Sequence, residues 1–190
     1  MEIKKIGVIG AGLMGAGIAQ VSAQAGFQVS LMDVEQRFVD KGIATIDKNL
    51  SRMTEKGKME PSVADAIRRR IKGTLSPQET ASDADVIIEA VIERMDLKKV
   101  LYKDLDGIAP AGTIFATNTS GLSITELGSI TSRPDKFIGM HFFNPVPVMK
   151  LVEVIRGYAT SDETVAVIKE LSAKMGKTAI EVLEAPGFVV

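Results

Sequence analysis

Near the amino terminus the chain reads Ile3-Lys4-Lys5-Ile6-Gly7-Val8-Ile9-Gly10-Ala11-Gly12-Leu13-Met14-Gly15, an apolar run that enters a glycine-rich turn. A helical pattern follows the turn, and residues 27–32 read as a second strand that ends at Asp33. This order predicts a βαβ unit. In such a turn the first glycine allows the bend, the second lets the backbone approach a pyrophosphate, and the third lets helix and strand pack closely. We therefore predict a dinucleotide site at the turn residues Gly10, Ala11, Gly12, Leu13, Met14 and Gly15.

Asp33 indicates which dinucleotide is bound. It lies 18 residues beyond Gly15, close to the spacing at which an acid reaches the adenosine ribose hydroxyls. Its charge would repel a 2′-phosphate, so the sequence favours NAD over NADP. The other interpretation of the turn is a glycine cluster that serves packing alone, and the flanking strand, helix and acid favour cofactor binding over it.

The composition is that of one globular α/β domain. A chain of 190 residues can bury a full core, and its formal net charge of −1 gives no electrostatic attraction for nucleic acid or a membrane surface. With no cysteine there is neither a disulfide framework nor a thiolate zinc site, and we expect no bound metal. The chain starts directly into a strand, and no apolar run approaches about 18 residues, so we expect a cytoplasmic protein.

A helical hairpin is predicted over residues 36–72. Gly57 interrupts the helical pattern, Pro61 restarts it and Gly73 ends it. The segment is rich in basic residues, namely Lys48, Arg52, Lys56, Lys58, Arg68, Arg69, Arg70 and Lys72. One interpretation is a solvated helix face. The other is a basic arm that meets an anionic substrate, with Arg52 and Lys56 as candidate substrate-binding residues.

Strand and helix patterns alternate through the rest of the chain. Strands are predicted at residues 86–90, 113–116, 137–140, 151–155 and 178–183, and helices over residues 97–105 and 164–175. The apolar run at residues 86–90 is typical of a strand buried on both faces of a parallel sheet. The sequence therefore predicts an α/β fold over residues 1–190, a Rossmann-type, doubly wound, mostly parallel sheet with the helical hairpin inserted.

Three polar features occur at or near predicted strand ends. Thr117-Asn118-Thr119-Ser120-Gly121 follows one strand, where ligands of open parallel sheets bind. His141, the single histidine, follows another, and imidazole suits base catalysis at neutral pH. Glu153 is a lone acid in an apolar strand, and a buried carboxylate needs a partner. Either Glu153 pairs with His141, or the two are a core histidine and an edge-strand acid.

The glycine turn, Asn118-Thr119-Ser120 and above all the run His141-Phe142-Phe143-Asn144-Pro145-Val146-Pro147-Val148-Met149-Lys150-Leu151-Val152-Glu153-Val154-Ile155 closely resemble the 3-hydroxyacyl-CoA dehydrogenase family, its short bacterial 3-hydroxybutyryl-CoA members in particular. The resemblance covers essentially the whole chain. It implies that His141 is the catalytic base, that Glu153 orients it and that Ser120 hydrogen-bonds the substrate. It implies further substrate contact from Asn144, and cofactor contacts from Asp33, Glu93, Lys98, Ser120 and Asn144. Without it, Glu93 and Lys98 would be interpreted as a surface ion pair.

The resemblance implies an NAD-dependent dehydrogenase of (S)-3-hydroxyacyl-CoA, acting on 3-hydroxybutyryl-CoA and acetoacetyl-CoA in fatty-acid or butanoate metabolism. A rival of another class is a Rossmann domain that binds NAD without catalysis. The second rival is another NAD-dependent hydroxy-acid dehydrogenase, such as a 3-hydroxyisobutyrate or sugar-acid enzyme, but those rely on a lysine base.

Two departures from the family pattern affect this interpretation. Gly121 stands where the family usually has a second serine. Family members also continue past a Pro-Gly-Phe-(Ile/Val)-Val run, matched here by residues 186–190, into a catalytic asparagine and a helical domain that forms the dimer and covers the substrate. The resemblance therefore implies an isolated NAD-binding domain of a homodimeric enzyme, at most weakly active by itself, with an apolar surface near residues 182–190 that promotes self-association.

Overall fold

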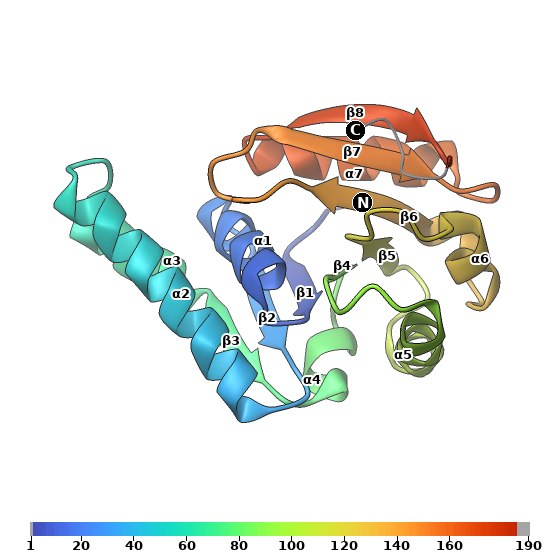
Figure 1. The fold of residues 1–190 in the computed structure, drawn as a ribbon, viewed down its shortest axis with the longest axis horizontal. Coiled ribbons are helices and arrows are strands. Elements are labelled where there is room, and N and C mark those ends of the chain that lie inside the picture. Colours follow the sequence, from blue (N-terminus) through green and yellow to red (C-terminus); the bar gives the residue numbers. More distant parts are fainter. Residues whose placement is uncertain (1, 186–190) are drawn as a thin grey trace.

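The structure, a computed structural model, describes residues 2–185 and begins with the predicted βαβ unit (Figure 1). Strand β1 (Lys5–Ile9) leads into helix α1 (Leu13–Gln24), which returns the chain to strand β2 (Gln28–Met32), parallel to β1. A Cβ added at Gly15 would lie 1.7 Å from the carbonyl oxygen of Gly10. The helix therefore packs against the turn at a point where only glycine fits, as the spacing of the motif predicts.

Eight strands form one sheet in the order β3-β2-β1-β4-β5-β6-β7-β8. The other strands are β3 (Ile71–Thr74), β4 (Val86–Glu89), β5 (Ile114–Thr117), β6 (Phe137–Phe142), β7 (Leu151–Arg156) and β8 (Thr178–Leu183). All neighbouring strands are parallel except β6 and β7, which are antiparallel. The order reverses between β1 and β4, and ligands of doubly wound sheets bind beyond such a point. The predicted doubly wound, mostly parallel sheet is confirmed.

Helices cover both faces of the sheet (Figure 1). They are α2 (Gln36–Glu55), α3 (Pro61–Arg69), α4 (Pro77–Ala81), α5 (Met95–Ile108), α6 (Ile124–Ser129) and α7 (Asp162–Lys174), with a 3-10 turn at Pro134–Lys136. One buried apolar cluster joins the sheet to α1, α2, α3 and α7, and a second joins it to α4, α5 and α6. A sheet covered on both faces explains why the strand at residues 86–90 reads as a continuous apolar run.

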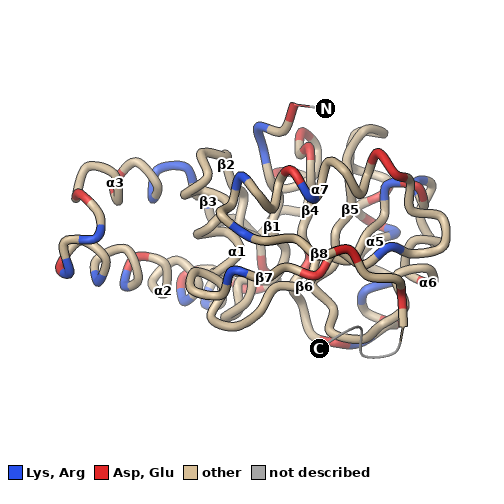
Figure 2. Tube along the Cα trace, turned by 90° about the horizontal axis from the view of Figure 1, so that it is seen from above, with Lys and Arg blue, Asp and Glu red and all other residues tan. Residues whose placement is uncertain are grey.

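The hairpin of α2 and α3 projects from the rest of the domain (Figure 1), with basic and acidic residues interspersed along it (Figure 2). Its predicted end at Lys72 is wrong, because α3 ends at Arg69 and residues 71–74 form β3, a strand that the sequence analysis missed. A Cβ added at Gly73 would lie 2.5 Å from Val39 Cγ1, so α2 packs directly on this strand. Glycine is thus required there for close helix–sheet packing, and it does not mark the end of a helix.

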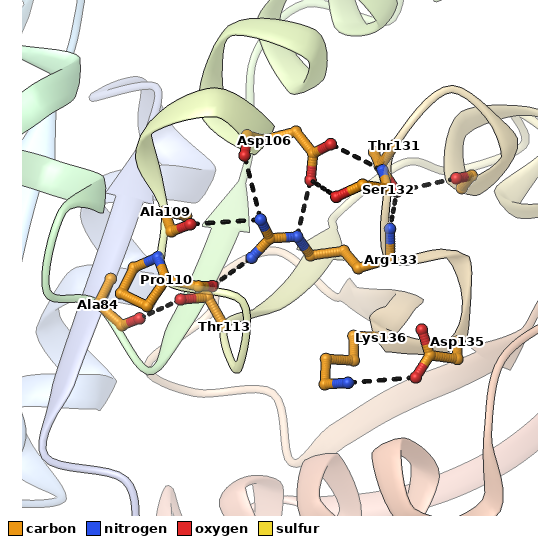
Figure 3. Close-up of polar contacts among 11 residues, drawn as sticks. Ala84, Asp106, Ala109, Pro110, Thr113, Thr131, Ser132, Arg133, Asp135 and Lys136 are labelled. Carbon is orange, nitrogen blue, oxygen red and sulfur yellow. Dashed lines mark hydrogen bonds and ion pairs between the residues drawn. The ribbon is translucent and has the colours of Figure 1, made fainter.

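A buried arginine fastens the end of α5 to the loop before β6 (Figure 3). Arg133 Nε donates to Asp106 Oδ1 at 2.7 Å, and the other guanidinium nitrogens donate to the carbonyl oxygens of Asp106, Ala109 and Pro110. The last carbonyl groups of a helix lack hydrogen-bond donors within the helix, and this guanidinium donates to carbonyl groups at the end of α5. The same Asp106 carboxylate accepts the backbone N–H of Ser132 at 2.7 Å.

The described residues contain neither a membrane-spanning helix nor a metal cluster. None of the helices within residues 2–185 is both long and apolar enough to cross a membrane. In the same part of the chain, no three His, Asp or Glu side chains are placed to hold a metal ion. Residues 186–190, which carry the Pro-Gly-Phe run and most of the surface expected to self-associate, lie outside the described residues.

Candidate active site

A cleft of about 910 Å³ is bounded by the glycine turn and the end of β2, and by two helices, the first half of α2 and α5. Its lining includes five residues predicted to bind the cofactor, namely Gly10, Ala11, Gly12, Leu13 and Asp33. Apolar side chains of α2 and α5, among them Phe38, Leu97 and Val100, form its walls. The volume is in the range of protein cofactor sites, and apolar walls suit the flat face of an adenine.

The mouth of the glycine turn is shaped for an anion. Gly12 is the N-cap of α1, no side chain caps it, and the first turn of the helix holds no acid. A Cβ built on Gly12 would meet no atom within 4 Å, whereas one on Gly10, whose φ is +98°, would lie 2.6 Å from the carbonyl oxygen of Ala90. The uncapped N-terminus of α1, with its partial positive charge, therefore lies beside open space at Gly12, which fits a pyrophosphate.

Asp33 stands at the end of β2, as its spacing predicts. Its Oδ2 accepts the backbone N–H of Ala11 at 2.7 Å, and its Oδ1 accepts that of Val34 at 2.7 Å. The carboxylate therefore belongs to the cleft and also fixes the glycine turn. A dinucleotide ribose held at the end of β2 would meet this charge.

His141 and Glu153 face one another across the antiparallel pair β6 and β7, where they are register partners. The distance from His141 Nδ1 to Glu153 Oε2 is 2.7 Å. The Glu153 side chain is fully buried, whereas 14% of the His141 side chain is exposed. A carboxylate only accepts hydrogen bonds, so the Glu153 contact favours the tautomer of His141 that carries its proton on Nδ1. The predicted pairing of the two residues is what the structure contains, in place of a core histidine and an edge-strand acid.

The turn that carries Ser120 is held by an acid from the loop after β4. Glu93 Oε1 accepts the backbone N–H of Ser120 at 2.8 Å and also the hydroxyl of Thr119. Asn118 Oδ1 accepts the backbone N–H of Phe142 at 2.8 Å, which ties the end of β5 to the end of β6. The Ser120 turn and the strand that carries His141 are thereby connected by hydrogen bonds.

The interactions of Glu93 favour its ionised form. Burial alone would raise the pKa of this carboxyl group, but the hydrogen bond from Thr119, the charge of Lys98 and the Ser120 N–H together lower it below its ordinary value. The expected ion pair with Lys98 is present, with Nζ 3.4 Å from Glu93 Oε2. The prediction that this pair lies on the surface is wrong for Lys98. Its side chain is buried, with Nζ 2.6 Å from Oε1 of a second acid, Glu89. A cofactor contact by Lys98 stays a prediction.

The other predicted residues, Asn144, Arg52 and Lys56, are exposed. Asn144 is exposed in the loop after β6, where it precedes Pro145 across a cis peptide bond. Arg52 lies in the last turn of α2 and Lys56 at its C-cap, both exposed and distant along the helix from its start at the cleft. The sequence analysis missed Glu89, whose signal is the one that marked Glu153, a lone acid at an apolar strand. It also missed the buried state of Lys98, for which the sequence carries no signal.

Comparison with known proteins gives one consistent result. Residues 5–185 match the family described as "3-hydroxyacyl-CoA dehydrogenase, NAD binding domain". A probable 3-hydroxybutyryl-CoA dehydrogenase of Bacillus subtilis is 51% identical over 189 residues, and the match covers 100% of this chain and 66% of that protein. The mitochondrial hydroxyacyl-coenzyme A dehydrogenase of Rattus norvegicus is 43% identical, with 99% of this chain and 62% of that protein covered.

A solved structure agrees with these relatives. The crystal structure of (S)-3-hydroxybutyryl-CoA dehydrogenase from Ralstonia eutropha superimposes with a TM-score of 0.97 at 47% identity, and the match covers 100% of this chain and 66% of that one. The chain thus spans just under two thirds of the length of the first curated relatives that it matches. The similarity is strong over the part that is shared.

Proposed function

The chain belongs to the 3-hydroxyacyl-CoA dehydrogenase family, whose NAD-binding domain it matches, and from this premise we propose that it serves the NAD-dependent oxidation of (S)-3-hydroxyacyl-CoA. The cofactor is NAD, as the open glycine turn and Asp33 predict. The substrate pair of the proposal is 3-hydroxybutyryl-CoA and acetoacetyl-CoA. The observation that carries this proposal is the contact of 2.7 Å between His141 of β6 and Glu153 of β7, because oxidation of an alcohol needs a positioned base.

Each residue of the site has one role in this proposal. Ser120 donates a hydrogen bond to the substrate oxygen, and His141 accepts the hydroxyl proton at Nε2. Glu153 stabilises the imidazolium that forms, since its carboxylate already accepts from Nδ1. When bound, NAD supplies the acceptor for the hydride that leaves the same carbon. Reduction of acetoacetyl-CoA runs through the same positions in reverse.

NAD binding in this proposal uses the glycine turn, Asp33 and the residues around Ser120. The N-terminus of α1 meets the pyrophosphate and Asp33 meets the adenosine ribose. Glu93 and Lys98 contact the cofactor from the loop after β4 and from α5, and Ser120 and Asn144 do so from the ends of β5 and β6. Ser120 and Asn144 also face the substrate.

The basic hairpin would bind the nucleotide end of coenzyme A. Arg52 and Lys56 would then meet the CoA phosphates through exposed charges, and salt screens such contacts strongly. We expect affinity for acetoacetyl-CoA to weaken with salt more steeply than affinity for acetoacetyl-pantetheine, which lacks the nucleotide. Equal salt slopes would leave the hairpin as a solvated face.

The rest of the working enzyme is also a proposal. The family relatives are longer than this chain, and a helical C-terminal domain would complete the substrate site and form a homodimer. We place the enzyme in the cytoplasm and in fatty-acid or butanoate metabolism.

Turnover with defined substrates tests the function. The chain would be joined to the remaining third of the Bacillus subtilis relative, which gives a protein called here the joined protein. Its oxidation of NADH would be followed with acetoacetyl-CoA and, as the control, with free acetoacetate. The proposal predicts a kcat/KM for the CoA ester that is at least about 100-fold higher, since binding of the distant CoA contributes to catalysis. NADH binding without turnover would indicate a binding module. Faster oxidation of 3-hydroxyisobutyrate or a sugar acid with NAD would indicate the second rival.

A further inference from the structure

Glu89 is an acid buried in the centre of the protein, at the end of β4. None of its side chain is exposed, and in the sheet it lies between Ile9 of β1 and Thr117 of β5. A carboxylate at such a position is costly unless every oxygen has partners. Burial of this group therefore implies a specific arrangement around it.

Both oxygens of Glu89 are occupied. Oε1 accepts the backbone N–H of Val91 at 2.7 Å and the Lys98 ammonium at 2.6 Å. Oε2 accepts the hydroxyl of Thr117 at 2.8 Å. The carboxylate thus connects three separate pieces of the domain, namely the loop after β4, helix α5 and the end of β5.

Lys98 carries this connection onward to the active site. Its ammonium lies between Glu89 and Glu93, and only 1% of its side chain is exposed. Glu93 in turn accepts the Ser120 N–H and the Thr119 hydroxyl. A continuous chain of contacts therefore runs from Glu89 through Lys98 and Glu93 to the Ser120 turn.

We infer that Glu89 is a positioning residue, which holds Lys98 against Glu93 and so fixes the Ser120 turn in the place where it meets the substrate. The inference rests on the proposed function for the role of Ser120, but the position of the turn can be measured without turnover. In this arrangement Lys98 bridges two acids, and Glu93 keeps its orientation only while Glu89 holds the ammonium. Charged groups in such a network depend on one another more than separate pairs do.

Exchange of backbone amide protons in the 190-residue chain tests the inference. The Ser120 amide is the readout, because its N–H bonds to Glu93. The Ser132 amide is the internal reference, because it bonds to a carboxylate outside the chain of contacts, that of Asp106. In Glu89→Gln we expect exchange at Ser120 to become at least about 10-fold faster relative to Ser132. Equal changes at the two amides would overturn the inference.

Two further variants separate positioning from stability. Glu89→Gln/Lys98→Met removes both charges, and such replacements of buried pairs often restore stability. The inference predicts a Ser120 amide that still exchanges at least about 10-fold faster in a protein as stable to urea as the unmutated chain. Recovery of the unmutated rate together with stability would show that Glu89 serves folding alone.

A matched pair of threonines keeps the test decisive if the Glu89 variants do not fold. Thr117→Val removes a buried hydroxyl that donates to Glu89, and Thr113→Val removes one that donates to the Ala84 carbonyl at the other end of β5. Only Thr117→Val should raise the exchange ratio of Ser120 to Ser132.

In the joined protein Glu89→Gln should also lower kcat/KM for acetoacetyl-CoA at least about 10-fold. Absence of turnover in the unmutated joined protein would count against the proposed function alone, while the exchange ratio still decides the role of Glu89.

Discussion

Asp33 combines two functions in one carboxylate. It accepts the N–H of Ala11, which fixes the glycine turn, and in the proposed function it meets the adenosine ribose, where its charge would repel a 2′-phosphate. Neutralising it should therefore weaken NADH binding and relieve the exclusion of NADPH at the same time. If both effects occur, the preference for NADH over NADPH is due to Asp33.

The prediction concerns Asp33→Ala in the 190-residue chain. The ratio of the NADPH to the NADH dissociation constant, measured by calorimetry, should fall about 10-fold, which corresponds to ~1.4 kcal/mol. Glu35→Ala is the control, because it removes a charge two residues further along that pairs with Arg37 at 2.9 Å and does not hold the turn. An equal effect of the two variants would assign the preference to overall charge rather than to Asp33.

Single residues show how far a sequence can predict a site. The residues alone left two alternatives for His141 and Glu153, a pair or a core histidine with an edge-strand acid, and only the family resemblance favoured the pair. Lys98 could not be placed, because its position in a helix says nothing about two acids that reach it from β4 and the following loop. Glu89 escaped notice because it lies near the end of the strand predicted at residues 86–90, where an acid is usually solvated.

Helix α1 packs against the loop that follows β6, the strand that carries His141. A Cβ added at Gly17 would lie 2.7 Å from Val146 Cβ, and Val146 is buried in the loop that also carries Asn144. Gly17→Ala should therefore lower the free energy of unfolding by about 1–3 kcal/mol, the usual cost of overpacking. Urea unfolding measures it. Gly107→Ala on the exposed side of α5, where a Cβ meets nothing within 4 Å, should instead raise the free energy of unfolding by about 0.5–1 kcal/mol. Equal signs for the two substitutions would contradict this packing.

The carboxyl end of α5 depends on the Arg133–Asp106 pair, whose side chains are only 7% and 16% exposed. Asp106→Asn leaves the guanidinium without its counter-charge and should cost about 3 kcal/mol at pH 7, as broken buried pairs do. Asp96→Asn is the control, because Asp96 pairs with Arg94 on the surface and should leave stability unchanged. Comparable losses in the two variants would contradict the account of Arg133 as the tie of this helix.

The same pair has a defined pH dependence. Burial alone would raise the pKa of Asp106, but hydrogen bonds from Ser132 and Arg133 outweigh it and lower the pKa below its ordinary value. A lowered pKa in the folded state means that the stabilisation is complete above the unfolded value of about 3.9 and is lost as the pH falls through the folded pKa. The difference in unfolding free energy between the unmutated chain and Asp106→Asn should therefore shrink below about pH 4.

Elements with long periodic patterns could be predicted from the sequence, and short ones could not. The first βαβ unit, the hairpin and the later strands were predicted close to their observed bounds. β3 was absorbed into the hairpin because its four residues, Ile71–Thr74, follow a basic helix without a break. Helices α4 and α6 have five and six residues, too few to show a helical period. The sequence analysis also did not predict that β7 runs antiparallel to β6, and this pairing places His141 opposite Glu153.

The whole chain should separate cofactor binding from turnover. The glycine turn, Asp33 and the switch point of the sheet lie within the described residues, so the 190-residue chain should fold and bind NADH. Its turnover of acetoacetyl-CoA should be lower by several orders of magnitude than that of the joined protein, because alignment and exclusion of water can supply about 7–11 kcal/mol of a barrier. Comparable rates for the two proteins would show that the shorter chain has a complete active site.

The central claim is that His141, oriented by Glu153, is the base of an NAD-dependent dehydrogenase. The most direct measurement is the kcat of acetoacetyl-CoA reduction by the joined protein carrying His141→Ala, with NADH affinity measured in parallel. The account predicts a fall in kcat of about 10²–10⁴-fold with NADH affinity nearly unchanged, and a fall of similar size in Glu153→Gln. A kcat within about threefold of the unmutated protein in His141→Ala would contradict it, because a positioned base contributes far more than that.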